Sequence, residues 1–170
     1  MNSSIAIPGL DPRCPGPSDF SLAYDPVFAG LITRTYVERL GKSLLPFELE
    51  REAAARWLYE EAPFCVLVHN TASDPRFVYA NRTAQLCFEF RWDEMTCLSS
   101  RLSAEAPNQA ERQDLIEAVT HAGFATGYRG LRIAKSGRRF WIEDVTMWQL
   151  TDAADTVRGQ AAAYNKWRDA

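Results

Sequence analysis

The sequence predicts an α+β fold, with a five-stranded antiparallel sheet, helices on one face and an N-terminal two-helix cap. Three observations indicate this class. Helical patterns occupy residues 26–62, two short strand patterns occupy residues 64–80, and three longer strand patterns occupy residues 128–164. Helical segments between the strand pair and the later strands are typical of a sheet that helices cover. We therefore divide the chain into an irregular proline-rich leader (1–25), a helical cap (26–62) and the α+β domain (63–170).

Length and composition indicate a globular protein. Of the 170 residues, 46% are apolar and 24% are charged, close to the average of globular domains. A chain of this length buries enough surface to fold without a disulfide or a metal. It contains no apolar run near the roughly 18 residues of a membrane span, and its first ten residues lack the positive start of a secretory signal. We expect a soluble, cytoplasmic protein with no membrane partner.

Charge and cysteine spacing narrow the function classes. The formal net charge is −3, whereas a nucleic-acid-binding domain usually presents a strongly basic face, so we expect no nucleic-acid partner. The four cysteines, Cys14, Cys65, Cys87 and Cys97, form no C-x-x-C pair. This spacing argues against a zinc site or a redox dithiol. Cys65 and Cys87 lie among apolar neighbours and are interpreted as small buried hydrophobes.

The leader and the first cap helix meet at Asp25. Five of the nine prolines fall within the first 26 residues, which predicts irregular backbone there. Asp25 is the expected N-cap of a helix over residues 26–40, with Pro26 at its first position and Gly41 as its C-cap. Its apolar stripe comprises Phe28, Leu31, Ile32, Tyr36 and Leu40.

The second cap helix is predicted to begin near Ser43 to Pro46 and to run to about Glu61. Ala54, Trp57 and Leu58 mark its expected buried side, and Pro63 ends the cap.

The middle of the chain alternates between short strands and helices. A nearly continuous apolar run at residues 64–69 predicts a buried strand, and residues 76–80 predict a second strand after a turn. Asn81 is the expected N-cap of a helix that runs through Phe88. A short helix at residues 93–98 and a longer one at residues 109–122 follow, with Gly123 as the C-cap of the longer helix.

The last third of the chain predicts three strands. Ser136-Gly137 is typical of a two-residue turn between strands at residues 128–135 and 138–150. That register places Leu131 opposite Ile142, Ile133 opposite Phe140 and Arg129 opposite Asp144, and it puts Trp148 on the same side as Ile142. A final strand is predicted over residues 156–164.

Several strings resemble known families. Residues 79–84 (Tyr-Ala-Asn-Arg-Thr-Ala), 88–95 (Phe-Glu-Phe-Arg-Trp-Asp-Glu-Met) and 137–150 resemble signatures of PAS domains. The chain is more closely similar to the MEKHLA family, a PAS-like group, over roughly residues 44–165. That likeness rests on the strings at residues 100–105, 130–133, 137–140 and 159–162. The family's name-giving letters do not occur in the chain. Glu89 also stands where PAS sequences usually have a glycine, so we expect that helix end to be built differently.

The resemblance implies a pocket between the helices and the sheet. An apolar pocket with a few polar groups is the usual site for a small ligand. The open alternative is that the same side chains simply fill a solid core. The candidate lining residues are Tyr79, Leu86, Phe90, Leu98, Leu115, Val119, Ile142 and Trp148.

The resemblance also raises two cofactors, neither of which we expect. His121 lies near the end of the long helix, where haem-binding PAS proteins carry an iron ligand, but a histidine there also complements the helix dipole. Cys97 invites comparison with flavin-binding light sensors, yet the string Thr96-Cys97-Leu98-Ser99 does not match theirs. The cofactor is therefore left unknown, and no metal site is predicted.

Basic residues gather on the predicted hairpin, at Arg129, Arg132, Lys135, Arg138 and Arg139. Arg129, Arg132 and Arg138 are candidates to hold a phosphate or a carboxylate. The open alternative is a solvated edge, and Arg129 with Asp144 is interpreted as a cross-strand ion pair.

His69, Glu143 and Asp144 are the obvious acid–base candidates. The chain has no nucleophile elbow, no zinc-protease motif and no phosphate-binding loop, so we do not expect an enzyme. An enzyme that uses His69 with a carboxylate stays as an alternative, and so does an interaction module without a ligand.

We expect a sensory or binding module that holds a small apolar ligand or a protein partner. Because no output segment is recognised in the chain, signalling would pass through self-association or a separate output protein. A homodimer through the N-terminal helices is expected by analogy with PAS proteins.

Overall fold

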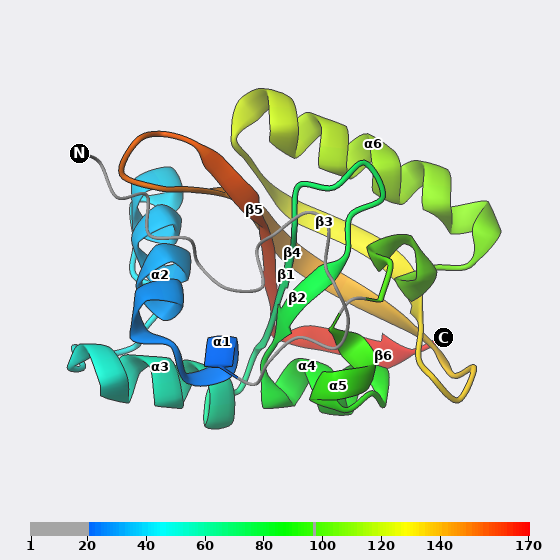
Figure 1. The fold of residues 1–170 in the computed structure, drawn as a ribbon. Coiled ribbons are helices and arrows are strands. Elements are labelled where there is room, and N and C mark those ends of the chain that lie inside the picture. Colours follow the sequence, from blue (N-terminus) through cyan, green and yellow to red (C-terminus); the bar gives the residue numbers. More distant parts are fainter. Residues whose placement is uncertain (1–20, 97) are drawn as a thin grey trace.

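The computed structural model describes residues 21–96 and 98–170, and these form one antiparallel sheet flanked by helices (Figure 1). The strand order is β2-β1-β5-β4-β3. β5 pairs with residues 146–151 of β4, and β6 pairs with residues 140–143 of the same strand. This sheet confirms the predicted fold class, with β6 as an addition that was not predicted. The strands are β1 (Cys65–His69), β2 (Phe77–Ala80), β3 (Phe124–Ile133), β4 (Arg139–Thr151), β5 (Val157–Tyr164) and β6 (Lys166–Asp169).

The first cap helix, α2 (Pro26–Leu40), has the predicted bounds and caps. The Asp25 carboxylate accepts hydrogen bonds from the backbone N–H groups of Val27 and Phe28, over 2.8 and 3.2 Å. Gly41 closes the helix with a left-handed φ of 71°. A single helical turn, α1 (Ser21–Tyr24), precedes α2 inside the predicted irregular leader.

The second cap helix, α3 (Arg51–Glu60), begins later than predicted. Residues 41–50 are not helical, and Pro46 disfavours helical backbone at the preceding residue, Leu45. The buried side also differs, because Ala55, Leu58 and Tyr59 are buried whereas Ala54 and Trp57 are only partly covered.

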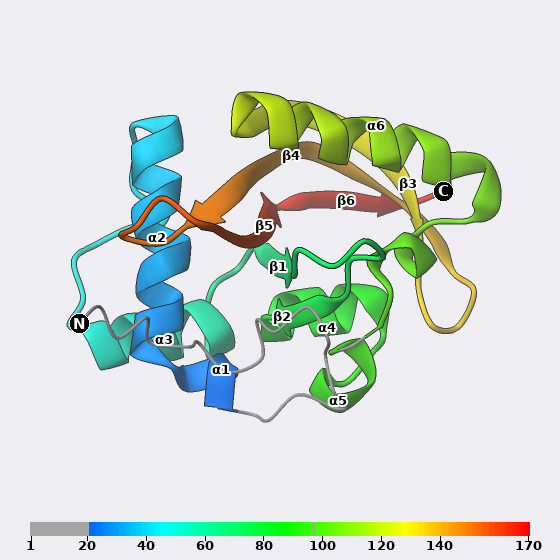
Figure 2. The same cartoon turned by 45° about the horizontal axis from the view of Figure 1, so that its top comes forward.

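The cap packs on one face of the sheet and builds a first core there. Trp148 of β4 is fully buried in it, and its indole Nε1–H donates to the Thr35 hydroxyl of α2 over 3.0 Å. The Tyr36 ring meets the Trp148 ring edge-on at 4.9 Å. Figure 2 shows α2 and α3 on one side of the strands and α6 on the other.

Three of the remaining helices contribute to a second core on the opposite face: α4 (Arg82–Phe88), α5 (Trp92–Met95) and α6 (Ala106–Ala122). The 3-10 helix η1 (Ser100–Ser103) precedes α6. Asn81 caps α4 as predicted, and its side chain also accepts from the Val66 N–H and donates to the Leu58 and Phe64 carbonyls. α6 begins three residues earlier than predicted and lies on β3 and β4.

The end of α4 corrects one expectation. Glu89 adopts the left-handed backbone that a glycine usually supplies, with φ 61°, so this helix end is not built differently. The Glu89 carboxylate offsets the strain through hydrogen bonds. It accepts from the Ser136 hydroxyl and backbone N–H and from Arg138 Nε over 3.2 Å. These bonds fasten the end of α4 to the β3–β4 turn.

The predicted register of the β3–β4 hairpin is wrong by one residue. Ala134 N–H donates to the Arg138 carbonyl, and Gly137 N–H donates to the Ala134 carbonyl, each over 2.9 Å. The loop therefore has three residues, with Gly137 in the left-handed conformation at φ 89°. Leu131 lies opposite Trp141, not Ile142. A slip of one residue exchanges the two faces of a strand.

A bulge in β4 shifts the β3–β4 register again, so the side chains on either side of it exchange faces of the sheet. Tyr128 pairs with Val145 and Gly130 pairs with Ile142, so Glu143 and Asp144 both lie opposite Arg129. Asp144 has a positive φ of 54°, as a bulge permits. Ile142 and Val145 therefore share the second core, while Trp148 belongs to the first core. The prediction that Trp148 and Ile142 share one face is wrong.

Candidate ligand site

A cavity of about 50 Å³ lies in the second core, between α6 and the sheet. Most of its wall is apolar, from side chains of β1, β2, β4, β5, α4 and α6: Leu67, Phe77, Phe88, Ile116, Ile142, Val145, Met147 and Ala162. Its polar groups are His69, Ser103, Arg112, Tyr128, Arg132, Gln160 and Tyr164. An apolar hollow with a few convergent polar groups is the usual form of a small-molecule site.

Arg112 brings a positive charge into the cavity from α6. Its residue is only 6% exposed, and its guanidinium donates to the Ser100 hydroxyl of η1. Burial, followed by the nearby charge of Arg132, lowers the pKa of Arg112 to about 10. The charge of Asp74 acts in the opposite direction, but among the described residues no carboxylate forms an ion pair with Arg112.

Arg132 brings a second positive charge from β3. It is 7% exposed, and its guanidinium donates to the Tyr128 hydroxyl over 3.4 Å and to the Leu131 carbonyl over 2.9 Å. Gly130 makes room for this arrangement, because a Cβ there would overlap the Tyr128 hydroxyl and lie 2.8 Å from Arg132 Nη1. Arg132 likewise has no carboxylate partner among the described residues.

His69 and Gln160 lie directly opposite each other on β1 and β5, so their side chains are neighbours on one face. His69 Nδ1 lies 3.0 Å from the Asn70 carbonyl, which assigns the proton to Nδ1 and leaves Nε2 as an acceptor. Both His69 Nε2 and Gln160 Oε1 are buried, and neither has a hydrogen-bond partner within residues 21–96 and 98–170. Burial lowers the pKa of His69 to about 4, so the ring is neutral at pH 7.

Only one of the predicted lining residues, Ile142, lines this cavity. Leu115 and Val119 are buried in the surrounding core, and Phe90 and Leu98 pack partly buried against it. Tyr79 and Trp148 lie in the first core, where the Tyr79 ring contacts the rings of Phe28, Tyr59 and Trp92. Leu86 is 79% exposed and lies outside both cores.

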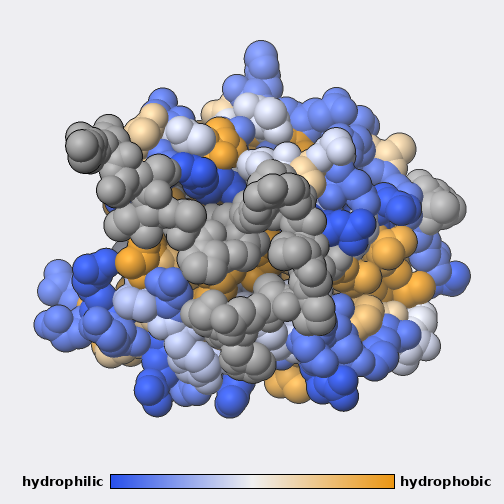
Figure 3. Space-filling view, viewed as in Figure 1, coloured by the Kyte–Doolittle hydropathy of each residue, from blue (hydrophilic) through white to orange (hydrophobic). Residues whose placement is uncertain are grey.

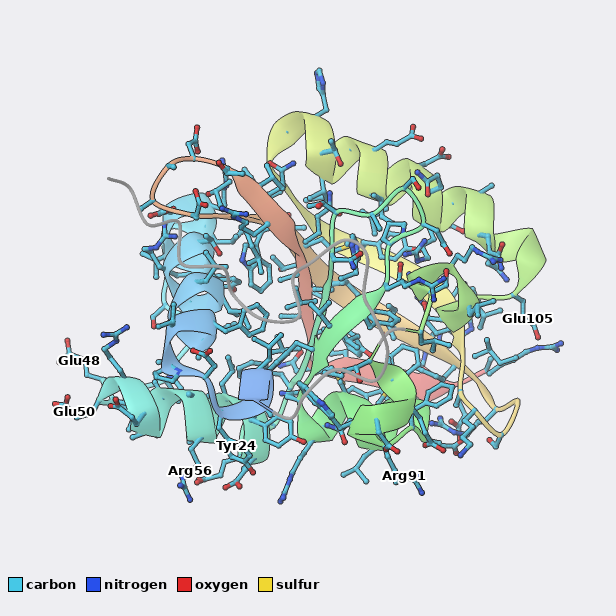
Figure 4. All side chains as sticks on the ribbon, in the orientation of Figure 1. Tyr24, Glu48, Glu50, Arg56, Arg91 and Glu105 are labelled. Carbon is cyan, nitrogen blue, oxygen red and sulfur yellow. The ribbon has the colours of Figure 1, made fainter. Side chains whose placement is uncertain are left out.

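The basic hairpin separates into paired arginines and one buried arginine. Arg129 contacts Glu143 at 3.3 Å, and Arg138 contacts both Glu89 and Asp169, at 3.2 and 2.7 Å. Arg139 contacts Glu105 at 2.8 Å, and Figure 4 shows Glu105 at the start of α6. Of the three anion-binding candidates, Arg132 alone lines the cavity.

The expected ion pair between Arg129 and Asp144 is wrong. Asp144 sits at the bulge with its side chain 66% exposed, and its carboxylate lies 3.6 Å from Lys166 Nζ. Arg129 pairs with Glu143 instead, and its guanidinium stacks 4.0 Å from the centre of the Trp141 ring.

The other candidates do not assemble a reactive group. His69 is buried while Asp144 is exposed, and no carboxylate is among the groups that shift the pKa of His69. His121 is exposed at the end of α6 and does not line the cavity. Cys97 lies outside the described residues. Cys65 and Cys87 are buried free thiols, as predicted.

Most of the lining residues were not predicted from the sequence, and Arg112 and Gln160 are the two of these that matter most for the chemistry of the site. Arg112 continues the inward stripe of Leu115, Ile116 and Val119 by one helical turn, and that spacing was the available signal. Gln160 follows Gly159 in a strand of small residues, where the sequence shows no pattern that marks it.

Across the part of the chain that the structure describes, no helix has the length and apolar character of a membrane span. In the same part, His, Cys, Asp and Glu form no group of three that could hold a metal. On the surface, hydrophilic residues cover most of the α3 and α6 region that Figure 3 presents.

Comparison with known proteins gives a family and a fold. The model of the MEKHLA domain matches residues 27–169. The curated proteins give no match. The solved structures include a PAS domain of a Colwellia psychrerythraea protein, with a TM-score of 0.53 and 16% identity over 66% of this chain and 90% of that one.

Two longer proteins also contain a similar fold. An RNA-binding light-oxygen-voltage receptor has a TM-score of 0.59 and 20% identity, over 75% of this chain and 35% of that one. A blue-light activated histidine kinase of Erythrobacter litoralis has a TM-score of 0.54 and 15% identity, over 66% of this chain and 34% of that one. The chain thus spans about a third of each of these two proteins.

Proposed function

Because the chain belongs to the MEKHLA-domain family and has the PAS-like fold, we propose that it is a sensory module that holds a small ligand in the cavity between α6 and the sheet. The observation that carries this proposal is the cavity itself, which is mostly apolar and receives several polar groups from α6, η1, β1, β3 and β5. A light-oxygen-voltage receptor and a blue-light activated kinase contain a similar fold, which supports a sensory role.

The size of the cavity bears on the ligand. Pockets for drug-sized molecules usually measure roughly 300 Å³ or more. The cavity here measures about 50 Å³, so the proposed ligand has few atoms, and neither a flavin nor a haem is proposed.

The proposed output is association with a second copy or a separate protein. The cap is the proposed contact surface, because α2 leaves Val27 and Val37 exposed at 42% and 46% after its inner side is buried.

Retention of a ligand is tested by native mass spectrometry of the full chain, compared with an Ala162→Leu variant. Ala162 faces the cavity from β5, so the three added carbon atoms fill it. The matched control is Ala153→Leu, at an exposed turn. We expect a bound small molecule in the native chain and in the control, and its loss in Ala162→Leu.

An unliganded native chain whose stability rises in Ala162→Leu would contradict the sensory proposal. That result would favour an interaction module whose cavity is only a packing defect.

A further inference from the structure

Two guanidinium groups are buried in the cavity without a counter-ion among the described residues. Arg112 and Arg132 are 6% and 7% exposed and line the same hollow. The surface arginines of the same hairpin differ, because Arg129, Arg138 and Arg139 each contact a carboxylate within 3.3 Å. A buried charge without a partner is strongly unfavourable. The charge of Asp74 acts on Arg112 without forming an ion pair with it. The two guanidinium groups therefore favour an anionic ligand in the hollow.

Arg112 and Arg132 have N–H groups beyond those used in the hydrogen bonds described above. A guanidinium carries five N–H donors in a planar fork. Arg112 uses one described bond, to Ser100, and Arg132 donates to Tyr128 and to the adjacent Leu131 carbonyl. Each is close enough to the other for its charge to act, since Arg132 lowers the pKa of Arg112. An anion between them relieves this repulsion and accepts paired hydrogen bonds.

The neighbouring polar side chains, His69 and Gln160, require a hydrogen-bond donor from the ligand. His69 Nε2 and Gln160 Oε1 are buried acceptors on adjacent strands, and no donor reaches them from the part of the chain that the structure describes. Gln160 Nε2 is already used, since it donates to the Thr120 hydroxyl over 2.9 Å. The ligand must therefore supply an O–H or N–H donor beside its anionic group. An ammonium would be repelled by the two guanidinium groups, so a hydroxyl fits better.

The rest of the wall limits the ligand further. Leu67, Ile116, Val145 and Met147 surround the hollow with apolar surface, which a fully polar phosphate would leave without partners for its remaining oxygens. The volume of about 50 Å³ leaves room for only a short carbon chain.

From these features, which rest on the proposed function, we propose that the cavity binds a short hydroxycarboxylate. Its carboxylate lies between Arg112 and Arg132, its hydroxyl donates to His69 or Gln160, and its carbon chain lies against the apolar wall.

Isothermal titration of the full chain with four probes tests the proposal: 2-hydroxybutanoate, 3-hydroxybutanoate, butanoate and butanamide. Charged hydrogen bonds of this kind change affinity about tenfold or more. We expect one of the two hydroxybutanoates to bind most tightly, butanoate to bind more weakly, and the neutral butanamide to bind at least tenfold more weakly than butanoate. Inorganic phosphate, at the same concentrations, is expected not to bind.

Arg112→Met and Arg132→Met remove each charge at similar bulk, and Arg129→Met and Arg139→Met are the matched surface controls. We expect at least a tenfold loss of hydroxybutanoate affinity in the first pair and no loss in the controls. In the absence of ligand, the first pair should unfold at the same or a higher denaturant midpoint, because an unpaired buried charge is gone. A purely structural role of these arginines predicts a lower midpoint.

Gly130→Ala provides an independent variant, because its Cβ displaces Tyr128 and Arg132 without removing a charge. It should weaken hydroxybutanoate binding while butanamide binding stays unchanged.

Three results would overturn the assignment: no binding by any carboxylate probe, equal binding of butanamide and butanoate, or full affinity in both Arg112→Met and Arg132→Met. If butanamide still binds and Ala162→Leu abolishes that binding, the cavity remains a ligand site and only the anion assignment fails. If a carboxylate binds and Ala162→Leu has no effect, the anion lies elsewhere and both proposals fail.

Discussion

Arg112 and Arg132 are unusual as residues, because both guanidinium groups are almost fully buried and neither meets a carboxylate among the described residues. Proteins generally bury a charge only when it is paired. Replacement by an apolar residue of similar volume would usually be neutral or stabilising. Retaining two such groups in one small cavity therefore suits binding better than folding.

His69 gives a prediction for the pH dependence of stability. Burial holds its pKa at about 4, below the ordinary value of 6.5, so the unfolded chain binds a proton that the native chain does not. The free energy of unfolding is unaffected by this group above pH 6.5. It falls by up to about 1.4 kcal/mol per pH unit as the pH decreases from 6.5 to 4. A His69→Gln variant should lack this component.

Urea unfolding of both proteins between pH 7.5 and pH 4 measures the difference. Carboxylates with lowered pKa values, such as Asp74 and Glu89, contribute to the pH dependence of both proteins and cancel in the comparison. Parallel stability profiles for native chain and variant would show that His69 takes up its proton in the folded state.

At the scale of elements, a buried polar contact joins the cap to the sheet inside an apolar core. Trp148 of β4 donates to the Thr35 hydroxyl, which in turn donates to the Leu31 carbonyl of α2 over 2.7 Å. The rings of Tyr36 and Trp148 complete the contact. The Thr35 hydroxyl thus joins α2 to β4 inside the core, and a partly buried contact joins them again where Arg34 Nη2 donates to the Thr151 carbonyl over 2.6 Å.

A Thr35→Val variant should lower the free energy of unfolding by about 1–3 kcal/mol, because the buried indole N–H loses its acceptor. The matched control is Thr33→Val, since the Thr33 hydroxyl bonds only to carbonyls of its own helix, over 3.0 and 3.3 Å, and lies partly exposed. We expect the control to change stability by less than about 0.5 kcal/mol. Equal effects in chemical denaturation would contradict the role of the Trp148 contact.

The elements show what local sequence could predict. Caps that depend on nearby residues were confirmed, as at Asp25, Gly41 and Asn81. The β3–β4 register was wrong because Ser136-Gly137 suits both a two-residue turn and the end of a three-residue loop. The residues next to the turn do not distinguish the two loop lengths. The Glu89 carboxylate, which bonds to the turn, is 47 residues away from Ser136 in the sequence.

The candidate site was less predictable than the fold, because the residues that line it depend on which face of the sheet each side chain occupies. The bulge at Asp144 decides whether Ile142 and Trp148 lie together, and a bulge carries no strong signal in a single sequence. Arg112 follows the helical stripe, but a charged residue on an inward stripe was not interpreted as buried.

At the scale of the whole molecule, the cap and the sheet share one core. Phe28 and Ile32 of the cap and Trp148 and Leu150 of the sheet are all buried in it. The family match over residues 27–169 likewise includes both parts. Removing residues 26–62 would expose this core to solvent, so a truncated chain is a poor probe of assembly.

Self-association through the cap is better tested by point variants. The outer side of α2 presents Val27, Gly30 and Val37 to solvent. We expect the native chain to sediment as a dimer at micromolar concentration and Val37→Glu to sediment as a monomer. Val157→Glu is the matched control, at a valine 38% exposed on β5, and should remain a dimer.

A native chain that sediments as a monomer would contradict the expected dimer. Equal dissociation of both variants would place the contact somewhere other than α2.

The most direct test of the central claim is a titration of the ¹⁵N-labelled full chain with 2-hydroxybutanoate and 3-hydroxybutanoate, followed by NMR. The account predicts saturable shifts of the backbone amides of Gln160 and Ala162 at the cavity wall with at least one of the two acids. The indole N–H of Trp148, buried in the other core, should not move. A saturable shift of the Trp148 indole with unchanged Gln160 and Ala162, or no saturable shift with either acid, would contradict a carboxylate site between α6 and the sheet.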